Sequence, residues 1–203
     1  MRTIRNFFAL IGLLSILGAV FVYSQYGERI QGMMGEYRAL QAMDPMAAEV
    51  YRGMWDKLKE TGNAADATVW RVPLAEGIGP KEAEESMKMI ANSRNIMFVA
   101  EQPLSEQVAL MTGEKQRLLK IYQFCNPLTA IRMVDYSDAF SAYFPCRIAM
   151  IEDKHGSYAL YSLNMDLMIH GGRSLPPGLF AETQHVKEVM LAIMEGGARG
   201  DFE

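Results

Sequence analysis

The chain has 203 residues, half of them apolar and 22% charged, with a formal net charge of -4 at pH 7. This suits one well-packed domain plus a short extra element and argues against extensive disorder. Residues 1–23 hold Arg2 and Arg5 but no acid, so the remaining 18 bases face 24 acids, a net charge of -6. We expect no nucleic-acid surface, because phosphate binding depends on clustered Lys and Arg.

An uncharged run, FFALIGLLSILGAVFVY, occupies residues 7–23. Its 17 residues are at the short end of what spans a membrane and exceed a typical signal-peptide core. We predict that residues 1–24 are a single-pass anchor in the inner (cytoplasmic) membrane. Arg2 and Arg5 place the N-terminus inside, so the domain faces outward, into the periplasm of a bacterial cell. A cleaved signal is the alternative, since Val22-Tyr23-Ser24 loosely fits a cleavage site.

Residues 25–66 are predicted to form a helical linker segment. It starts with a polar, Gly-punctuated stretch that reaches Gly35. Asp44 and Pro45 then suit an N-cap and a first helical residue, and Gly62 suits the helix end. Between them, apolar residues recur at three- and four-residue spacing: Met46, Val50, Tyr51, Met54, Trp55 and Leu58. Methionines can bind copper, but at helical spacing they more often pack in a core.

Residues 67–203 are predicted to form an α+β domain. Strands are expected at residues 68–74, 95–100, 118–125, 145–152 and 157–163, and the main helices from residue 80 and over residues 180–194. A short polar stretch ending at Gly156 indicates a hairpin between the last two strands. The last helix is expected to end at Gly196-Gly197. This order predicts helices on one face of a mainly antiparallel sheet.

Two cysteine-centred phrases stand out in this domain. IYQFCNP ends at Pro127, FPCRIAMIED starts at Phe144, and a glycine turn then leads into YALYSLN. Over residues 69–194 the chain resembles the domain of unknown function 302 family. The resemblance implies a fold similar to the saddle-like TATA-binding-protein topology, strand, helix, four strands, helix, and often a homodimer. Since the activity of that family is unknown, the resemblance carries over no catalytic residue.

Cys125 closes one predicted strand and Cys146 opens another. If these strands are antiparallel neighbours, both sulfurs lie at the same edge of the sheet, where a disulfide would stabilise the fold by roughly 3 kcal/mol. Alternatively, the two cysteines are inert buried thiols, or they form a metal-binding or redox-active pair. Asn126 suits the cap of a short helix that starts at Pro127. With Cys125, Asn126 and Cys146, the residues Pro145 and Arg147 complete the candidate ligand-binding set.

Arg147 has two possible roles. Its guanidinium can lower the pKa of a thiol or hold an anion, but strand alternation places it on the face opposite Cys146. An ion pair with an acid such as Asp135 or Asp138, or a hydrogen bond to the carbonyls of the turn after Asn126, is therefore expected instead. A run of acids at Glu82, Glu84 and Glu85 is expected on the solvated first turns of a helix.

Met165, Met168 and His170 lie within six residues. Such a set can hold copper or serve as axial haem ligands. No Cys-x-x-Cys-His motif is present in the sequence, so covalent haem is excluded. Methionines in a turn after a strand more often fill the core, and no cofactor is predicted.

Two functional hypotheses remain. The favoured one is a membrane-tethered, outward-facing binding or assembly module without catalytic activity, acting as a homodimer or in a membrane protein complex. The alternative is a redox or carrier protein that uses Cys125 and Cys146, or that holds sulfur, copper or haem near residues 165–170. Function depends on sites and not on folds, so the fold does not choose between them.

Overall fold

The structure is a computed structural model that describes residues 2–202, with the side chains of residues 6–29 and 31–202. The chain divides into two compact units after Met43. The first unit is helix α1 (Arg2–Gln41). Within it, the segment Asn6–Arg29 has a mean hydropathy of 2.3 and is long and apolar enough to cross a membrane, a property that cleaved signal sequences share. The helix continues through the Gly-punctuated stretch after Ser24, which the sequence pattern did not indicate.

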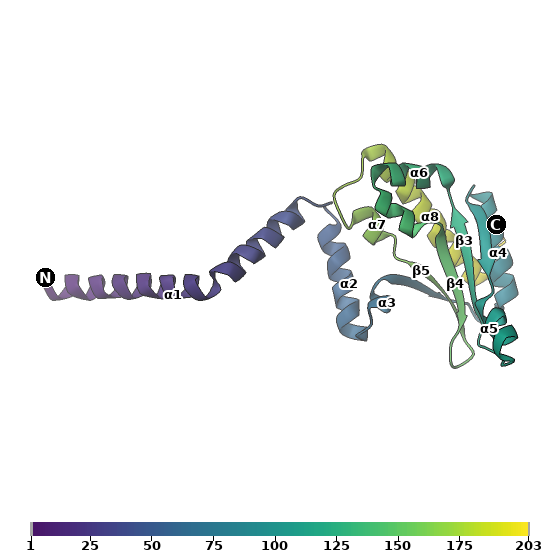
Figure 1. The fold of residues 1–203 in the computed structure, drawn as a ribbon, viewed down its shortest axis with the longest axis horizontal. Helices are drawn as coiled ribbons and strands as arrows, with labels where there is room; N and C mark the ends of the chain where they lie inside the picture. Colours follow the sequence, from purple (N-terminus) through teal and green to yellow (C-terminus); the bar gives the residue numbers. More distant parts are fainter. Residues whose placement is uncertain (1, 203) are drawn as a thin grey trace. The chain divides into compact units, whose positions relative to one another are not determined.

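The second unit contains a five-stranded antiparallel sheet with the strand order β1-β5-β4-β3-β2 (Figure 1). Its strands are β1 (Val69–Pro73), β2 (Met97–Gln102), β3 (Leu119–Cys125), β4 (Cys146–Glu152) and β5 (Tyr158–Leu163). Helix α4 (Pro80–Ser93) follows β1, and helix α8 (Pro177–Arg199) ends the unit. This confirms the α+β class and the order strand, helix, four strands, helix.

The core lies between one face of the sheet and the two long helices α4 and α8. Alternation along the strands places Tyr122, Phe124, Ile148, Met150 and Leu160 on this face, and all five are fully buried. Helices α4 and α8 pack side by side over them, as Figure 1 shows. On the other face, side chains such as Ile121 and Ala149 are only partly buried.

Helix α8 does not end at Gly196-Gly197 as expected but at Gly200, which has a φ of 71°. The reason is the packing of α8 against α4. A Cβ atom at Gly196 would lie 2.3 Å from Ile90, and one at Gly197 would lie 2.4 Å from Met87. The two glycines therefore let α8 approach α4 closely within a continuing helix.

The second unit starts at Asp44, whereas the sequence placed the domain boundary near residue 67. Helix α2 (Ala47–Thr61) packs on α7 (Asp166–His170), and the short α3 (Ala64–Ala67) leads into β1. Gly62 ends α2 in the left-handed conformation, as predicted. Asp44 is not the N-cap, however. That position is Met46, and the Asp44 carboxylate accepts the Met46 N–H and is buried.

The remaining connections follow local turn chemistry. Asn126 caps helix α6 (Pro127–Tyr136) as predicted, since its Oδ1 accepts the N–H groups of Leu128 and Thr129. Gly156 has a φ of 83° in the β4–β5 hairpin. Helix α5 (Leu104–Thr112) joins β2 to β3, and the 3-10 helix η1 (Asp138–Tyr143) precedes β4.

Candidate functional site

The two cysteines lie at the same end of neighbouring strands but on opposite faces of the sheet. Cys146 is paired with Phe124, and Cys125 is paired with Met97. Because directly opposed residues point to the same face, Cys146 shares the helix-covered face with Phe124, and Cys125 lies on the other face. Both cysteines are free. The two cysteines thus lie at the same edge of the sheet, as expected for antiparallel neighbours, but the register turns their side chains to opposite faces and the disulfide considered above is not formed.

The electrostatics of the thiols do not suit a nucleophile. Burial raises the pKa of Cys146 to about 11, an effect that nearby Arg147 only partly offsets. Burial also raises the pKa of Cys125. Both groups are therefore protonated at neutral pH, whereas thiol chemistry needs the thiolate. The geometry favours small buried side chains over a reactive pair.

The other members of the cysteine set are also placed by the fold. Arg147 lies on the open face opposite Gln123 and is exposed. It forms no ion pair among the described side chains of residues 6–29 and 31–202, so the pairing expected with Asp135 or Asp138 is absent there. Pro145 follows a cis peptide bond just before β4. Asn126 uses its side chain as a helix cap. Cys146 and Arg147 line a narrow pocket of about 20 Å³ together with Met165 and Met168, and Cys125, Asn126 and Pro145 do not line it.

His170 lies at the centre of a buried hydrogen-bond network. Its Nδ1 lies 2.9 Å from Oδ1 of Asp44, and its Nε2 lies 3.1 Å from Nε2 of Gln184. With Asp44 ionised, Nδ1–H donates to the carboxylate, and the side-chain amide of Gln184 contacts Nε2. Ser174 donates to the second oxygen of Asp44 at 2.9 Å. The hydroxyl is directed to the carboxylate and not to the imidazole, so this is not the arrangement of a serine nucleophile.

Asp44 is kept ionised by its partners. Burial raises the pKa of this carboxyl, but hydrogen bonds from the Met46 backbone, His170 and Ser174 outweigh that effect and bring its pKa below the usual value. In addition, the Asp44 N–H donates to the carbonyl of Gly172 at 2.8 Å. The carboxylate therefore fastens the start of α2 to the loop after α7.

The methionines next to His170 pack in the interior. Met165 is buried in the core cluster, and Met168 is partly buried against it. Both nitrogens of His170 are engaged, and in the part of the chain that the structure describes no three His, Cys, Asp or Glu residues are grouped to hold a metal. Met165 and Met168 line one small pocket, and His170 is not among its lining residues.

A groove of about 350 Å³ lies beside His170, between α2 and the elements α7 and α8. Ligand pockets in proteins have volumes of roughly 300–1,000 Å³. Its lining residues come from one side of α2 and from the facing elements: Met46, Glu49, Val50, Gly53, Met54, Lys57, Ala67, Asn164, Asp166, His170 and Lys187. On the facing wall, Lys187 and Asp166 form an ion pair of 2.6 Å. This is the candidate binding site of the unit.

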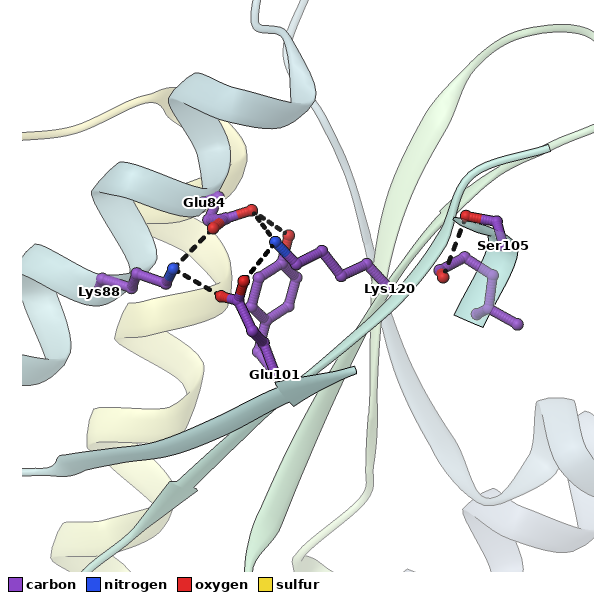
Figure 2. A network of polar contacts seen from close by, with 7 residues as sticks. Glu84, Lys88, Glu101, Ser105 and Lys120 are labelled. Carbon is purple, nitrogen blue, oxygen red and sulfur yellow. Dashed lines mark hydrogen bonds and ion pairs between the residues drawn. The ribbon is translucent and has the colours of Figure 1, made fainter. Parts of the chain in front are cut away.

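A second polar cluster joins α4 to β2 and β3 (Figure 2). Lys88 and Lys120 each contact both Glu84 and Glu101, at distances between 2.6 and 2.9 Å, so that the four charges form a closed ring. The hydroxyl of Tyr122 donates to Glu84 at 2.8 Å. Glu84 is thus not on a solvated turn as the sequence suggested, because β3 brings a lysine and a tyrosine to it.

The ring is electrically balanced. Burial raises the pKa of Glu84, but hydrogen bonds from Lys120, Lys88 and Tyr122 lower it to about 2. Burial and the Glu84 carboxylate raise the pKa of Tyr122. A cavity of about 580 Å³ adjoins the ring near Lys81. Since each charge in the ring already has two partners, we assign the ring a structural role, linking the helix layer to the sheet.

The comparisons with known proteins agree with this fold. The family described as "Domain of unknown function DUF302" matches residues 70–196, more than half of the chain. The protein belongs to the DUF302 family. A solved structure of an uncharacterized conserved DUF302 protein from Bacillus stearothermophilus is 14% identical, with a TM-score of 0.50. That similarity covers 63% of this chain and 95% of the other. A search of curated proteins found no match.

The DUF302 region does not include every residue of the groove. It supplies Asn164, Asp166, His170 and Lys187, whereas the lining residues from Met46 to Ala67 precede it. Sequence reasoning found His170 but missed Asp44, Ser174 and Gln184 as its partners. The only signal in the sequence was the polar character of Asp44 next to Pro45, which equally suits a helix cap.

Proposed function

We propose that this protein is a membrane-tethered, non-catalytic binding or assembly module. Helix α1 holds it in the cytoplasmic membrane with the N-terminus inside, and the DUF302 unit lies on the outer, periplasmic side. The observation that supports this most is the segment Asn6–Arg29, which has a mean hydropathy of 2.3, carries an uncharged run over residues 7–23 and is exposed. Such a surface is stable in lipid and costly in water.

The non-catalytic part of the proposal rests on the polar groups of the unit. The thiols of Cys125 and Cys146 have raised pKa values and lie on opposite faces. His170 is saturated by Asp44 and Gln184.

The open sheet face supports the assembly part. It carries the partly buried apolar residues Leu119, Ile121, Ala149 and Ile151 on the central strands β3 and β4. Apolar surface of this kind on a central sheet is a common contact between protein chains. Pairing of two copies through this face is the form of assembly that we propose.

Protease accessibility tests the tether and its orientation. The full chain with a C-terminal tag is expressed, and protease is added to spheroplasts and, separately, to sealed inverted membrane vesicles. We expect the tagged unit to be degraded in spheroplasts and protected in inverted vesicles. The opposite pattern would contradict the orientation. Recovery in the soluble fraction, with residues 1–24 absent by mass, would contradict the tether and favour a cleaved signal.

A further inference from the structure

The groove beside His170 is built by one continuous side of α2. The residues Met46, Glu49, Val50, Gly53, Met54 and Lys57 follow one another at spacings of three and one, which is the spacing of a single helix face. Gly53 lies in the middle of this side. A Cβ atom added there would have no heavy atom within 4 Å, so the groove is open at its centre.

The groove is lined by two acidic and two basic side chains, and only one acid and one base form an ion pair with each other. Lys187 and Asp166 form an ion pair on one wall. On the α2 wall, Glu49 and Lys57 also line the groove, and among residues 6–202 that the structure describes neither takes part in an ion pair. A ligand with a single sign of charge would gain no net attraction here, whereas a ligand with both signs would find one partner for each.

The positions of Glu49 and Lys57 give the length of such a ligand. They are eight residues apart on α2, which corresponds to roughly 12 Å along the helix axis. An extended chain of three residues spans about 10 Å. Between the two charges, Val50 and Met54 offer an apolar floor, and Asn164 on the facing wall offers an amide that can bond to a peptide group.

We infer that this groove binds a short zwitterionic peptide of two or three residues, with its ammonium group at Glu49, its carboxylate at Lys57 and an apolar side chain over Gly53. The inference rests on the proposed function as a binding module and names its ligand class. The groove is lined by residues of α2, which precedes the DUF302 region, and by residues within that region. The inference therefore applies to this chain, which contains both parts. The Asp44–His170 bond holds the two walls together.

Isothermal titration of the intact, detergent-solubilised protein with the tripeptide Ala-Leu-Ala and the dipeptide Ala-Leu tests the inference. We expect saturable binding, and a loss of about tenfold in affinity when the amine is acetylated or the carboxylate amidated. Lys57→Met and Glu49→Gln should each weaken binding by about the same factor. The matched control is Lys59→Met, because Lys59 is on the same helix, pairs with Asp56 and does not line the groove.

Gly53→Leu is the sharpest variant. A Cβ atom at this position meets no heavy atom within 4 Å, the longer side chain is expected to occupy the open centre of the groove, and replacing a mid-helix glycine raises helix stability. We expect binding to be lost while the thermal unfolding midpoint stays the same or rises. If this variant fails to fold, the comparison of peptide affinity between Lys57→Met and Lys59→Met tests the inference instead.

Two results would overturn the inference. One is the absence of saturable binding at peptide concentrations up to about 10 mM, which would exclude even a dissociation constant near 1 mM. The other is binding that persists in Gly53→Leu or is unaffected by capping both ends of the peptide. If the protein is nevertheless extracted from membranes only by detergent, the proposed membrane tether is still supported. Failure of the peptide-binding inference can therefore be distinguished from failure of the tether.

Discussion

Asp44 and His170 are 126 residues apart in the sequence, and their side chains share a buried hydrogen bond of 2.9 Å. Asp44 is the first residue of the compact unit, directly after the unit that contains the apolar helix. His170 ends α7, inside the DUF302 region. This bond therefore joins the segment that leads into α2 to the family domain.

The Asp44–His170 bond predicts a large effect for Asp44→Ala. The change leaves the His170 ring, the Ser174 hydroxyl and the Met46 N–H without their acceptor, and it should lower the free energy of unfolding by about 3 kcal/mol. Denaturant unfolding measures this loss. Limited proteolysis should also cut α2 sooner in the variant.

Asp56→Ala is the control for Asp44→Ala. Asp56 and its partner Lys59 each have side chains that are 57% exposed, and such surface pairs contribute less than about 1 kcal/mol. Equal stability of the two variants would show that the buried network does not fasten α2.

The Glu84 ring predicts a specific acid sensitivity. The pKa of Glu84 is about 2 in the folded protein and 4.5 for the unperturbed group, so its stabilisation is complete above pH 4.5 and is lost as the pH falls toward 2. Glu84→Gln should lower stability at neutral pH by roughly 2 kcal/mol and reduce its decline between pH 4.5 and 2. Urea unfolding across this pH range measures both effects. Glu85→Gln, at an exposed neighbouring position on α4, should leave the profile unchanged.

The thiols predict slow, base-dependent labelling. Because the pKa of Cys146 is raised to about 11, its alkylation rate at neutral pH should be far below that of an exposed thiol and should rise up to that pH. Intact mass should be the same with and without reductant, since the register separates the two sulfurs. A shift of two hydrogen masses on reduction would mean that β3 and β4 are arranged differently from the structure described above.

The open sheet face predicts an association that a charge can break. Ile121 lies opposite Ala149 on β4 and Gln102 on β2, in the middle of that face. If the protein pairs through this face as proposed, light scattering should find the detergent-solubilised wild type as a dimer and Ile121→Arg as a monomer, with unfolding recorded in parallel. Leu110→Arg is the control, because Leu110 is an exposed apolar residue on α5. A dimer that survives Ile121→Arg but not Leu110→Arg would place the contact elsewhere.

Part of this structure could be predicted from local chemistry. Asn126 and Pro127 specify a capped helix start on their own, and Gly156 specifies a left-handed turn. The alternation that buries Tyr122 and Phe124 is visible in the sequence because its period is two. In each case the deciding neighbours are only a few residues away.

The features that escaped prediction depend on distant partners. Glu84 resembles a solvated helix residue until β3 brings Lys120 and Tyr122 to it. Gly196 and Gly197 resemble a helix end until α4 lies against them. The faces of Cys125 and Cys146 depend on which residue of β3 lies opposite β4, and a shift of one residue would reverse them.

Alkaline carbonate extraction of the full chain tests the membrane tether most directly. The wild-type protein should stay in the membrane pellet, and Leu13→Lys with Leu17→Lys should move it to the supernatant, because each lysine near the centre of a span costs about 3 kcal/mol. Met33→Lys, in α1 beyond the span, should leave the protein in the pellet. Release of the intact wild-type chain, with residues 1–24 still present by mass, would contradict the account.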